Sequence, residues 1–582
     1  MSSVSKNWLD CSPVLLREVE LYTDLNLPIR EENTLFAACE FGGPIAIAIP
    51  RISSNDDKWD IITRTSSGEP LNKETIEAYN VMTIAWTKEQ KLVVLERHGR
   101  VNVYTPMGLK AESYLMCRRD QSVGVSGWKI FSNTEGKTIQ SGLAALTESK
   151  QIFVANSIHN KVVWQLPDTH TKDSNITAWT VFCKIASPPT VVMAVNGQIS
   201  MGRHGTTAQI HDFQWTISES EGVYVDIQPN WEHSQLAFFN ASGQIQIVDC
   251  NDYSLLHNIK YQYDKSALGY YWCGNDALCI HTPRELTFIS KESSSYGFSL
   301  SEKVFIDVEL DGVKVFSKNA LIFHTVVNEN LQAVFGVASG LPGAMLFEAA
   351  VKRNKKSHLV YDYIKNIKSN LKTAVDQCLY AAAHSYEPEV QEQLLEAAKL
   401  GKSIENRYDS SQFVAICKEI KVLHTVRMKR VGIPLSFPQL AELKISILLN
   451  RLIDLKQWPA AMELAKYMEL TEEQGVHHVL GQWASSLIEE CKKNGYDAAE
   501  VDEKIYNKLR GFSSINYANI AEKAHQTGLK ELAELMLNRE KRKSRQVELL
   551  LKISDSEKKE HLNGIYLQKA LTIASKSQQP DL

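Results

Sequence analysis

The chain has 582 residues, of which 44% are hydrophobic and 23% charged, and its formal net charge is −4. This length exceeds what one hydrophobic core supports and predicts two or more large units. The slightly acidic balance gives no electrostatic reason to expect a nucleic-acid partner.

The ten cysteines are dispersed between Cys11 and Cys491, and no two of them form a C-x-x-C pair. Such spacing does not suit zinc and is typical of proteins from a reducing compartment. Residues 1–18 contain no apolar segment of a signal peptide, and the apolar stretch at 44–50 is too short to span a membrane. The sequence therefore predicts a cytoplasmic protein.

One pattern of short strands recurs in the first part of the chain. Its first copy comprises residues 84–86, 92–95 and 99–104, and its second comprises 225–227, 236–239 and 243–247. In both copies a leucine precedes a turn glycine by seven residues, as Leu92 precedes Gly99 and Leu236 precedes Gly243. Repeats of about 40 to 50 residues indicate propeller blades of four strands, so the region would hold about seven blades. A pair of β-sandwiches would explain the same alternation.

Near Met345 the apolar residues change to helical spacing. Helices are predicted over 371–382, 390–398, 413–420, 440–448 and 461–468, with Gly401 ending the second. Ser436 with Gln439, and Thr471 with Gln474, have the spacing of capping boxes and predict two helix starts. Residues 517–524 and 529–536, joined at Gly528, predict a hairpin of two antiparallel helices.

The predicted fold class is therefore all-β then all-α. A seven-bladed β-propeller occupies residues 1–345, and an irregular α-solenoid of helical hairpins occupies 346–582. A further apolar helix begins near Leu567 and no polar capping repeat follows, so the solenoid is expected to be incomplete at its C-terminal end, as in a fragment or a short isoform.

No motif predicts a reaction centre. Gly136-Lys137-Thr138 resembles the end of a phosphate-binding loop, but Phe131 stands where the first glycine is needed. Glu473 and His477 lie one helical turn apart, but a zinc protease needs two histidines four residues apart, and His478 is adjacent to His477. We therefore favour a pair of side chains on a helix surface. We predict no catalytic, cofactor-binding or metal-binding residues, and the sequence names no partner-binding residue.

Two further segments have simple structural interpretations. The basic run Arg539, Lys541, Arg542, Lys543 and Arg545 could contact an acidic partner or lipid headgroups, but a solvated loop between helices is favoured. Residues 202–205 (G-R-H-G) are typical of a hairpin turn.

Several strings in one order along the chain resemble the vacuolar protein sorting-associated protein 16 family. The more specific ones are E-L-D-G-V-K-V-F-S at 309–317, V-L-H-T-V-R at 422–427 and G-I-P-L at 432–435. Others lie at 20–22, 41–46, 338–344, 394–398, 474–476 and 546–551.

The resemblance implies a core scaffold subunit of the class C tethering complexes HOPS and CORVET, without catalytic residues. Its implied partners are other propeller–solenoid subunits, with an indirect link to Rab GTPases and SNAREs. It also implies peripheral association, through the complex, with late endosome, lysosome or vacuole membranes before SNARE-mediated fusion.

The family's solenoid continues further and there grips the SM-family SNARE-binding subunit, so no residue of that contact is carried over to this chain. Two other classes explain the same architecture: a coat or nuclear-pore scaffold, and an enzyme with its site in the propeller channel. The expected partner surfaces are the propeller's top loops and the concave face of the solenoid.

Overall fold

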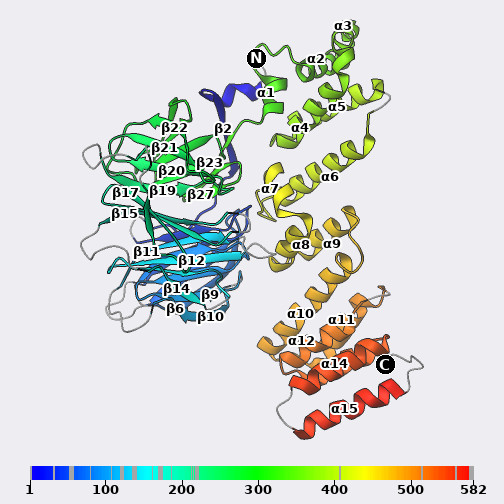
Figure 1. The fold of residues 1–582 in the computed structure, drawn as a ribbon. Coiled ribbons are helices and arrows are strands. Elements are labelled where there is room, and N and C mark those ends of the chain that lie inside the picture. Colours follow the sequence, from blue (N-terminus) through cyan, green and yellow to red (C-terminus); the bar gives the residue numbers. More distant parts are fainter. Residues whose placement is uncertain are drawn as a thin grey trace. The chain divides into compact units, whose positions relative to one another are not determined.

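The computed structural model describes residues 3–575 except 31–32, 52–57, 79, 107, 118–123, 134–139, 160–161, 168–174, 185–186, 212, 214, 217–221, 406–407, 513–514 and 557–559. Two compact units divide the chain, Met1–Leu443 and Lys444–Leu582. The strands end at Val326 and the first α-helix begins at Glu329, both inside the first unit (Figure 1). The predicted domain division at residue 345 stays a prediction.

The described strands of the first unit form seven antiparallel sheets. Sheets one to three comprise β3 (Leu35–Ala38), β4 (Ile45–Pro50), β5 (Lys58–Arg64) and β6 (Pro70–Glu77); β7 (Val81–Trp86), β8 (Leu92–Glu96), β9 (Arg100–Tyr104) and β10 (Lys110–Leu115); and β11 (Val125–Asn133), β12 (Gln140–Thr147), β13 (Ile152–Ala155) and β14 (Val163–Gln165). Sheets four to six comprise β15 (Ile176–Phe182), β16 (Thr190–Val195), β17 (Gln198–Arg203) and β18 (Gln209–His211); β19 (Tyr224–Pro229), β20 (Gln235–Asn240), β21 (Gln244–Asp249) and β22 (Leu255–Lys260); and β23 (Gly269–Cys273), β24 (Ala277–His281), β25 (Glu285–Ser290) and β26 (Ser295–Ser299).

The seventh sheet joins the two ends of the β region. It comprises β1 (Trp8–Cys11), β2 (Val14–Tyr22), β27 (Phe305–Glu309), β28 (Gly312–Phe316) and β29 (Leu321–Val326). Strand β2 pairs antiparallel with β29 from Leu16–Val326 to Tyr22–Leu321. Because β27 contacts both β23 and β3, this sheet closes the ring of sheets and leaves no gap between the last blade and the first.

Buried middle strands hold the blades together. Every residue of β8, β16 and β24 is buried, because a neighbouring sheet covers each face. The turn glycines of the two sequence repeats, Gly99 and Gly243, have φ of +80° and +83°, which glycine adopts without steric cost. The structure confirms the seven-bladed propeller and rules out the pair of β-sandwiches.

Helices follow the propeller within the first unit. They are α1 (Glu329–Phe335), α2 (Pro342–Asn354), α3 (Val360–Ile367), α4 (Leu371–His384), α5 (Pro388–Ile404), α6 (Ser410–Val426) and α7 (Phe437–Leu443). Gly401 does not end α5 as predicted: it lies inside the helix, where a Cβ would come within 2.5 Å of Val375 and 2.8 Å of Leu346. This glycine therefore serves close helix packing, a tertiary requirement that its sequence position does not reveal.

The connection between α6 and α7 packs directly on the propeller. Ser67 donates to the carbonyl of Lys429 at 2.7 Å, and Tyr22 donates to the carbonyl of Arg427 at 2.8 Å. Gln439 donates to Asp311 at 2.7 Å. The predicted capping box is confirmed here, since Ser436 Oγ accepts the N–H of Gln439, and Gln439 Oε1 that of Ser436, both at 3.2 Å.

Replacing Gly432 with alanine is expected to loosen this contact. Gly432 has φ +75°, and its Cβ would lie 2.4 Å from Ser67 Oγ and 3.0 Å from Thr65. Gly205 has the same φ but open space around it, so Gly205→Ala is a matched control. The left-handed backbone costs about 1–2 kcal/mol in both variants, and the clash adds about 1–3 kcal/mol in Gly432→Ala alone. Chemical unfolding of the first unit measures the free energy of unfolding of both variants. Equal losses of stability in Gly432→Ala and Gly205→Ala would show that the clash with Ser67 and Thr65 does not matter.

The second unit consists of helical hairpins. Its helices are α8 (Ile445–Asp454), α9 (Trp458–Tyr467), α10 (Val476–Asn494), α11 (Ala498–Leu509), α12 (Tyr517–Gln526), α13 (Lys530–Arg539), α14 (Lys543–Ser556) and α15 (Glu560–Ser575). The α12–α13 hairpin confirms the predicted one, with Gly528 at φ +88° in its turn. Its apolar side chains, among them Ile520, Ala524, Leu532 and Met536, pack in one core with those of α10 and α11.

Two predicted helix boundaries in this region are wrong. The apolar stripe 440–448 is broken at Lys444, whose φ of +65° ends α7 and separates it from α8. Thr471 does accept the N–H of Gln474, at 3.4 Å, but this bond closes a turn, and α10 begins five residues later, at Val476. The hydrophobic pattern is present at 440–448 and the capping pattern at Thr471. In both places the backbone nevertheless forms a turn, because tertiary packing outweighs the local pattern.

Candidate functional site

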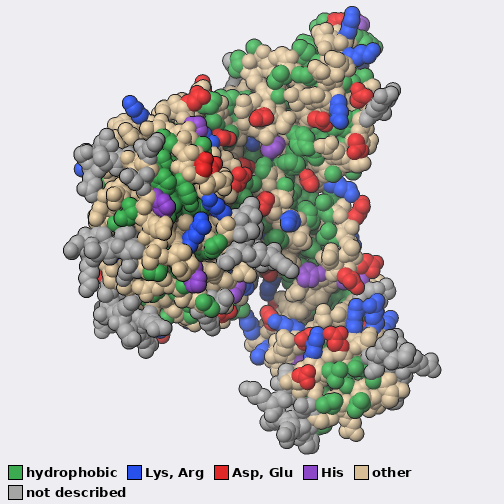
Figure 2. Space-filling view, in the orientation of Figure 1, with side chains coloured by type: hydrophobic (Ala, Val, Ile, Leu, Met, Phe, Trp, Pro, Cys, Tyr) green, Lys and Arg blue, Asp and Glu red, His purple; other side chains and the backbone are tan. Residues whose placement is uncertain are grey.

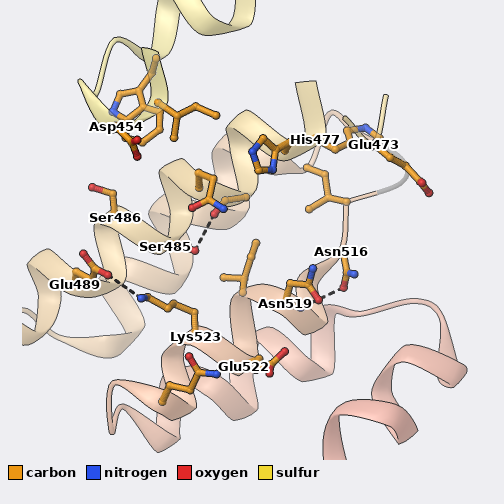
Figure 3. Close-up of a pocket in the computed structure, with 18 of the residues that line it drawn as sticks. Asp454, Glu473, His477, Ser485, Ser486, Glu489, Asn516, Asn519, Glu522 and Lys523 are labelled. Atoms are coloured by element: carbon orange, nitrogen blue, oxygen red, sulfur yellow. Dashed lines mark hydrogen bonds and ion pairs between the residues drawn. The ribbon is translucent and has the colours of Figure 1, made fainter. Parts of the chain in front are cut away.

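A hollow of about 770 Å³ lies on the second unit, along the face formed by α8, α10 and α12 (Figure 3). We call it the α10 groove. Its walls carry mostly polar and small side chains from these helices and their connections, together with the apolar Ile453, Trp458, Ile515 and Ile520, and Arg545 of α14 reaches it. Its volume lies in the range of binding pockets.

Helix α10 turns its apolar side chains away from the groove, while Ile453 of α8 and Ile520 of α12 contribute to the groove lining. In α10, Ala484 and Ile488 are fully buried in the hairpin core, while Ser485 and Ser486 line the groove. Gly481 also lines it, and a Cβ there would meet nothing within 4 Å. Small side chains along α10 therefore keep the hollow open.

Two ion pairs fix charged side chains beside the groove. Lys523 of α12 reaches Glu489 of α10 at 2.8 Å (Figure 3), and Lys456 reaches Glu490 at 2.9 Å. Both pairs are largely solvent-exposed, so each contributes about 0–1 kcal/mol to stability. Each pair neutralises its own two charges, while the carboxylates of Glu473 and Glu522 also line the groove.

Several groove side chains keep their hydrogen-bonding groups available. Within the described residues, the amides of Gln482 and Gln526, the side chain of Asn519 and the hydroxyl of Ser486 make no hydrogen bond, although all four line the groove. An amide both donates and accepts, so such side chains can pair with the backbone of an extended segment. The arrangement therefore suits recognition of a polypeptide.

The histidines predicted on a helix surface occupy different environments. Glu473 lies in the turn before α10, so it does not form the predicted helical pair with His477. The side chain of His477 is 10% exposed and lies 3.9 Å from Glu472 instead. His478 bonds Asn450 at 2.9 Å, and partial burial lowers the pKa of its imidazole, which favours the neutral form. The prediction missed these positions because the turn at 472–475 delays the helix start.

The residues that could bind a metal or act as nucleophiles lie throughout the described part of the chain. No three His, Cys, Asp or Glu side chains there are placed to hold a metal ion. Nine of the ten cysteines are buried, and burial raises the pKa of thiols such as Cys117, to about 11, which disfavours the reactive thiolate.

Three other segments were singled out from the sequence: the phosphate-loop resemblance, the predicted hairpin turn and the basic run. Gly136, Lys137 and Thr138 lie outside the described residues, while Phe131 is buried in β11. Gly202 and Arg203 end strand β17, and the turn to the paired strand β18 begins at His204 and Gly205, which confirms a hairpin turn that starts two residues later than predicted. In the basic run, Arg539 is held by Asp502 and lies over the ring of Tyr506, so it is not part of a solvated loop.

Sequence reasoning did not find the groove. A signal was present in Gly481, Gln482, Ser485 and Ser486, which place small and polar residues on one side of a helix whose other side is apolar. Exposed helix positions are commonly polar, so this signal alone does not separate a groove from an ordinary solvated face. Only the neighbouring helices α8 and α12 turn that face into a hollow.

The fold defines a class of protein, a β-propeller followed by helical hairpins, one face of which carries the α10 groove. The sequence model described as "Vps16, N-terminal region" matches residues 4–415, and "Vps16, C-terminal region" matches 515–562. The chain belongs to the Vps16 family.

Curated relatives agree with this assignment. A Caenorhabditis elegans protein named vacuolar protein sorting-associated protein 16 homolog is 28% identical over 94% of this chain and 64% of its own length. A Drosophila melanogaster protein of the same name is 25% identical over 94% of this chain and 65% of its own length. The chain thus spans about two thirds of the length of these relatives.

Among solved structures, the β-propeller domain of Myceliophteria_thermophila Cps50 (Swd1) is 12% identical, with 53% of this chain and 99% of that chain covered. Its TM-score of 0.39 is too low to add to the argument for the fold, which rests on the strand pairing above. Of the described helices, none has the length and apolar character to cross a bilayer.

Proposed function

We propose that this chain is a non-catalytic core scaffold subunit of a multisubunit membrane-tethering complex of the HOPS/CORVET type. It would act in vacuolar protein sorting, in the docking of vesicles at late endosomes, lysosomes or vacuoles before SNARE-mediated fusion. The family membership carries the proposal, and the names of the curated relatives support it. A closed propeller with docked helices and separate hairpins suits a scaffold, because each part offers a different partner surface.

The partners in this proposal are other propeller–solenoid subunits of the complex. The α10 groove would receive an extended segment of one of them, since its amide and hydroxyl groups can pair with a polypeptide backbone. The propeller loops would serve as a second surface. Rab GTPases and SNAREs would be linked through those subunits, and membrane association would be peripheral.

Affinity purification of the tagged 582-residue chain from cells, followed by mass spectrometry, tests the function. Recovery of class C tethering subunits is the expected result. Recovery of coat or nuclear-pore components in their place would overturn the proposal in favour of the alternative scaffold class. The SM-family subunit is not required for the expected result.

Two substitutions at Gly481 test the groove within the same experiment. Gly481→Phe places a large side chain in the hollow and is expected to reduce recovery of one subunit by tenfold or more, as loss of about 1.4 kcal/mol implies. Gly481→Ala is the matched control: it leaves the groove open and is expected to stabilise the hairpins by about 0.5–1 kcal/mol, because alanine favours the helix interior. Equal recovery with both variants would show that no subunit binds in the groove.

A further inference from the structure

A set of exposed basic side chains lies at one end of the hairpins of the second unit. It comprises Lys508 and Arg510 at the end of α11, Lys541 and Arg542 between α13 and α14, and Lys543 at the start of α14. We call these five residues the basic edge. Lys and Arg side chains gather on the right-hand side of these hairpins in Figure 2.

The two parts of the basic edge are brought together by specific contacts. Arg539, the last residue of α13, forms a two-pronged ion pair with Asp502 of α11, and its guanidinium carbon lies 3.9 Å from the centre of the Tyr506 ring. The end of α13 is thereby held against α11. The carbonyl of Tyr506 accepts the backbone N–H of Arg510 at 2.8 Å in the last turn of α11, so Lys508 and Arg510 lie within about one helical turn of the ring that Arg539 covers.

Glu540 fixes the loop that carries the remaining charges. Its carboxylate is 5% exposed and accepts the N–H of Ala518, in the first turn of α12, at 3.2 Å, and that of Arg542 at 2.9 Å. Gln546 donates to the carbonyls of Leu537 and Glu540 at 3.1 and 2.6 Å. The loop is therefore held against α12, α13 and α14 by its backbone and by Glu540 and Gln546. The predicted solvated loop is confirmed for Lys541 and Arg542, whose side chains are exposed between the two helices.

Two of the acids in this region, Asp502 and Glu540, are used by these internal contacts. Asp502 is occupied by Arg539, and Glu540 by backbone N–H groups. Lys508, Arg510, Lys541 and Arg542 make no ion pair within the described residues. Glu503 is the exposed acid that remains on the adjoining turn of α11. The basic edge therefore has a local excess of positive charge on a chain whose total charge is −4.

We propose that the basic edge binds directly to the surface of a membrane rich in anionic lipids. None of its five residues lines the α10 groove, so the edge presents long side chains outward from the ends of hairpins. Such a surface fits a flat array of headgroups better than a peptide, which needs a groove for its backbone. This contact goes beyond the proposed function, in which membrane association comes through other subunits.

Vesicle flotation with the purified 582-residue chain tests the proposal. The probes are phosphatidylcholine vesicles with and without phosphatidylserine. Flotation with the phosphatidylserine vesicles alone is expected, and added salt should weaken it because it screens exposed charges. Lys541→Gln combined with Arg542→Gln should lower the partition coefficient roughly 30-fold, since each charge contributes on the order of a fivefold change.

Lys492→Gln combined with Lys493→Gln is the matched control. It removes two exposed charges from the last turn of α10, and it should leave flotation unchanged. The proposal is overturned if the wild-type chain does not float, or if both double variants lose binding equally. Binding of a soluble polyglutamate peptide without vesicle binding would assign the edge to an acidic protein segment instead. Circular dichroism of each variant confirms that the hairpins remain folded.

Discussion

Replacing Lys314 with methionine is expected to destabilise the propeller unit by about 3–5 kcal/mol. Lys314 on β28 forms an ion pair with Glu309 on the neighbouring strand β27, and the two side chains are 1% and 0% exposed. Burial raises the pKa of the Glu309 carboxyl, and it raises that of nearby Asp307 well above the usual range. Without the lysine, these acids must be buried without a cation or take up protons, and both outcomes cost stability.

A second substitution separates charge from packing. Both carboxylate oxygens of Glu309 accept the N–H of Phe41, at 3.0 and 3.1 Å, so Glu309→Gln keeps an acceptor for that bond while removing the charge. The double variant Lys314→Met with Glu309→Gln should therefore be more stable than Lys314→Met alone. Lys73→Met, which removes an exposed pair with Asp60 at 3.3 Å, should cost no more than about 1 kcal/mol. Urea unfolding gives the free energy of unfolding of all three variants. Similar losses of stability for Lys314→Met and Lys73→Met would show that the buried ion pair matters no more than an exposed one.

The sequence predicted the blades for a physical reason. The two clearest repeats correspond to β7–β9 and β19–β21, where a buried leucine, a tight turn and a glycine recur at fixed spacing. Strand alternation and turn glycines are local requirements, and they can be read from neighbouring residues. The hairpin α12–α13 was predictable for the same reason.

Pairings between distant residues were not predictable. Nothing near 14–22 indicates that this strand will pair with 321–326, because antiparallel register depends on the partner as well as on the strand. The same limit hid the contact between Glu309 and Phe41, because these residues are 268 positions apart and meet only when the ring closes. Glu309 and Lys314 lie on paired neighbouring strands, but the burial of their ion pair also depends on that closure. The α10 groove needs three helices at once, so it could not be predicted from any one of them.

Lowering the pH from 7 to 5 is expected to destabilise the first unit, chiefly through two buried histidines. Burial lowers the pKa of His324 and of His384 to about 4, while their unfolded value is about 6.5. Above pH 6.5 both are neutral in the folded and the unfolded chain, so their stability contribution is fully present. As the pH falls towards 4, the unfolded chain takes up protons that the folded chain excludes, and at pH 5 the loss is about 2 kcal/mol per histidine.

His324 offers the sharper test of this effect, because it lies on the closing strand β29 between aromatic rings. Its ring centre is 4.5 Å from that of Phe298 and 5.1 Å from that of Phe288. His324→Phe should remove about half of the change in the free energy of unfolding between pH 7 and pH 5, whatever its effect on stability at pH 7. Phe298→Leu alters the same cluster without a titrating group, so it should lower stability equally at both pH values. Urea unfolding at pH 7 and at pH 5 gives the free energy of unfolding at each pH. If the difference between the two values in His324→Phe equals that of the wild-type chain, this imidazole does not make the stability of the propeller depend on pH.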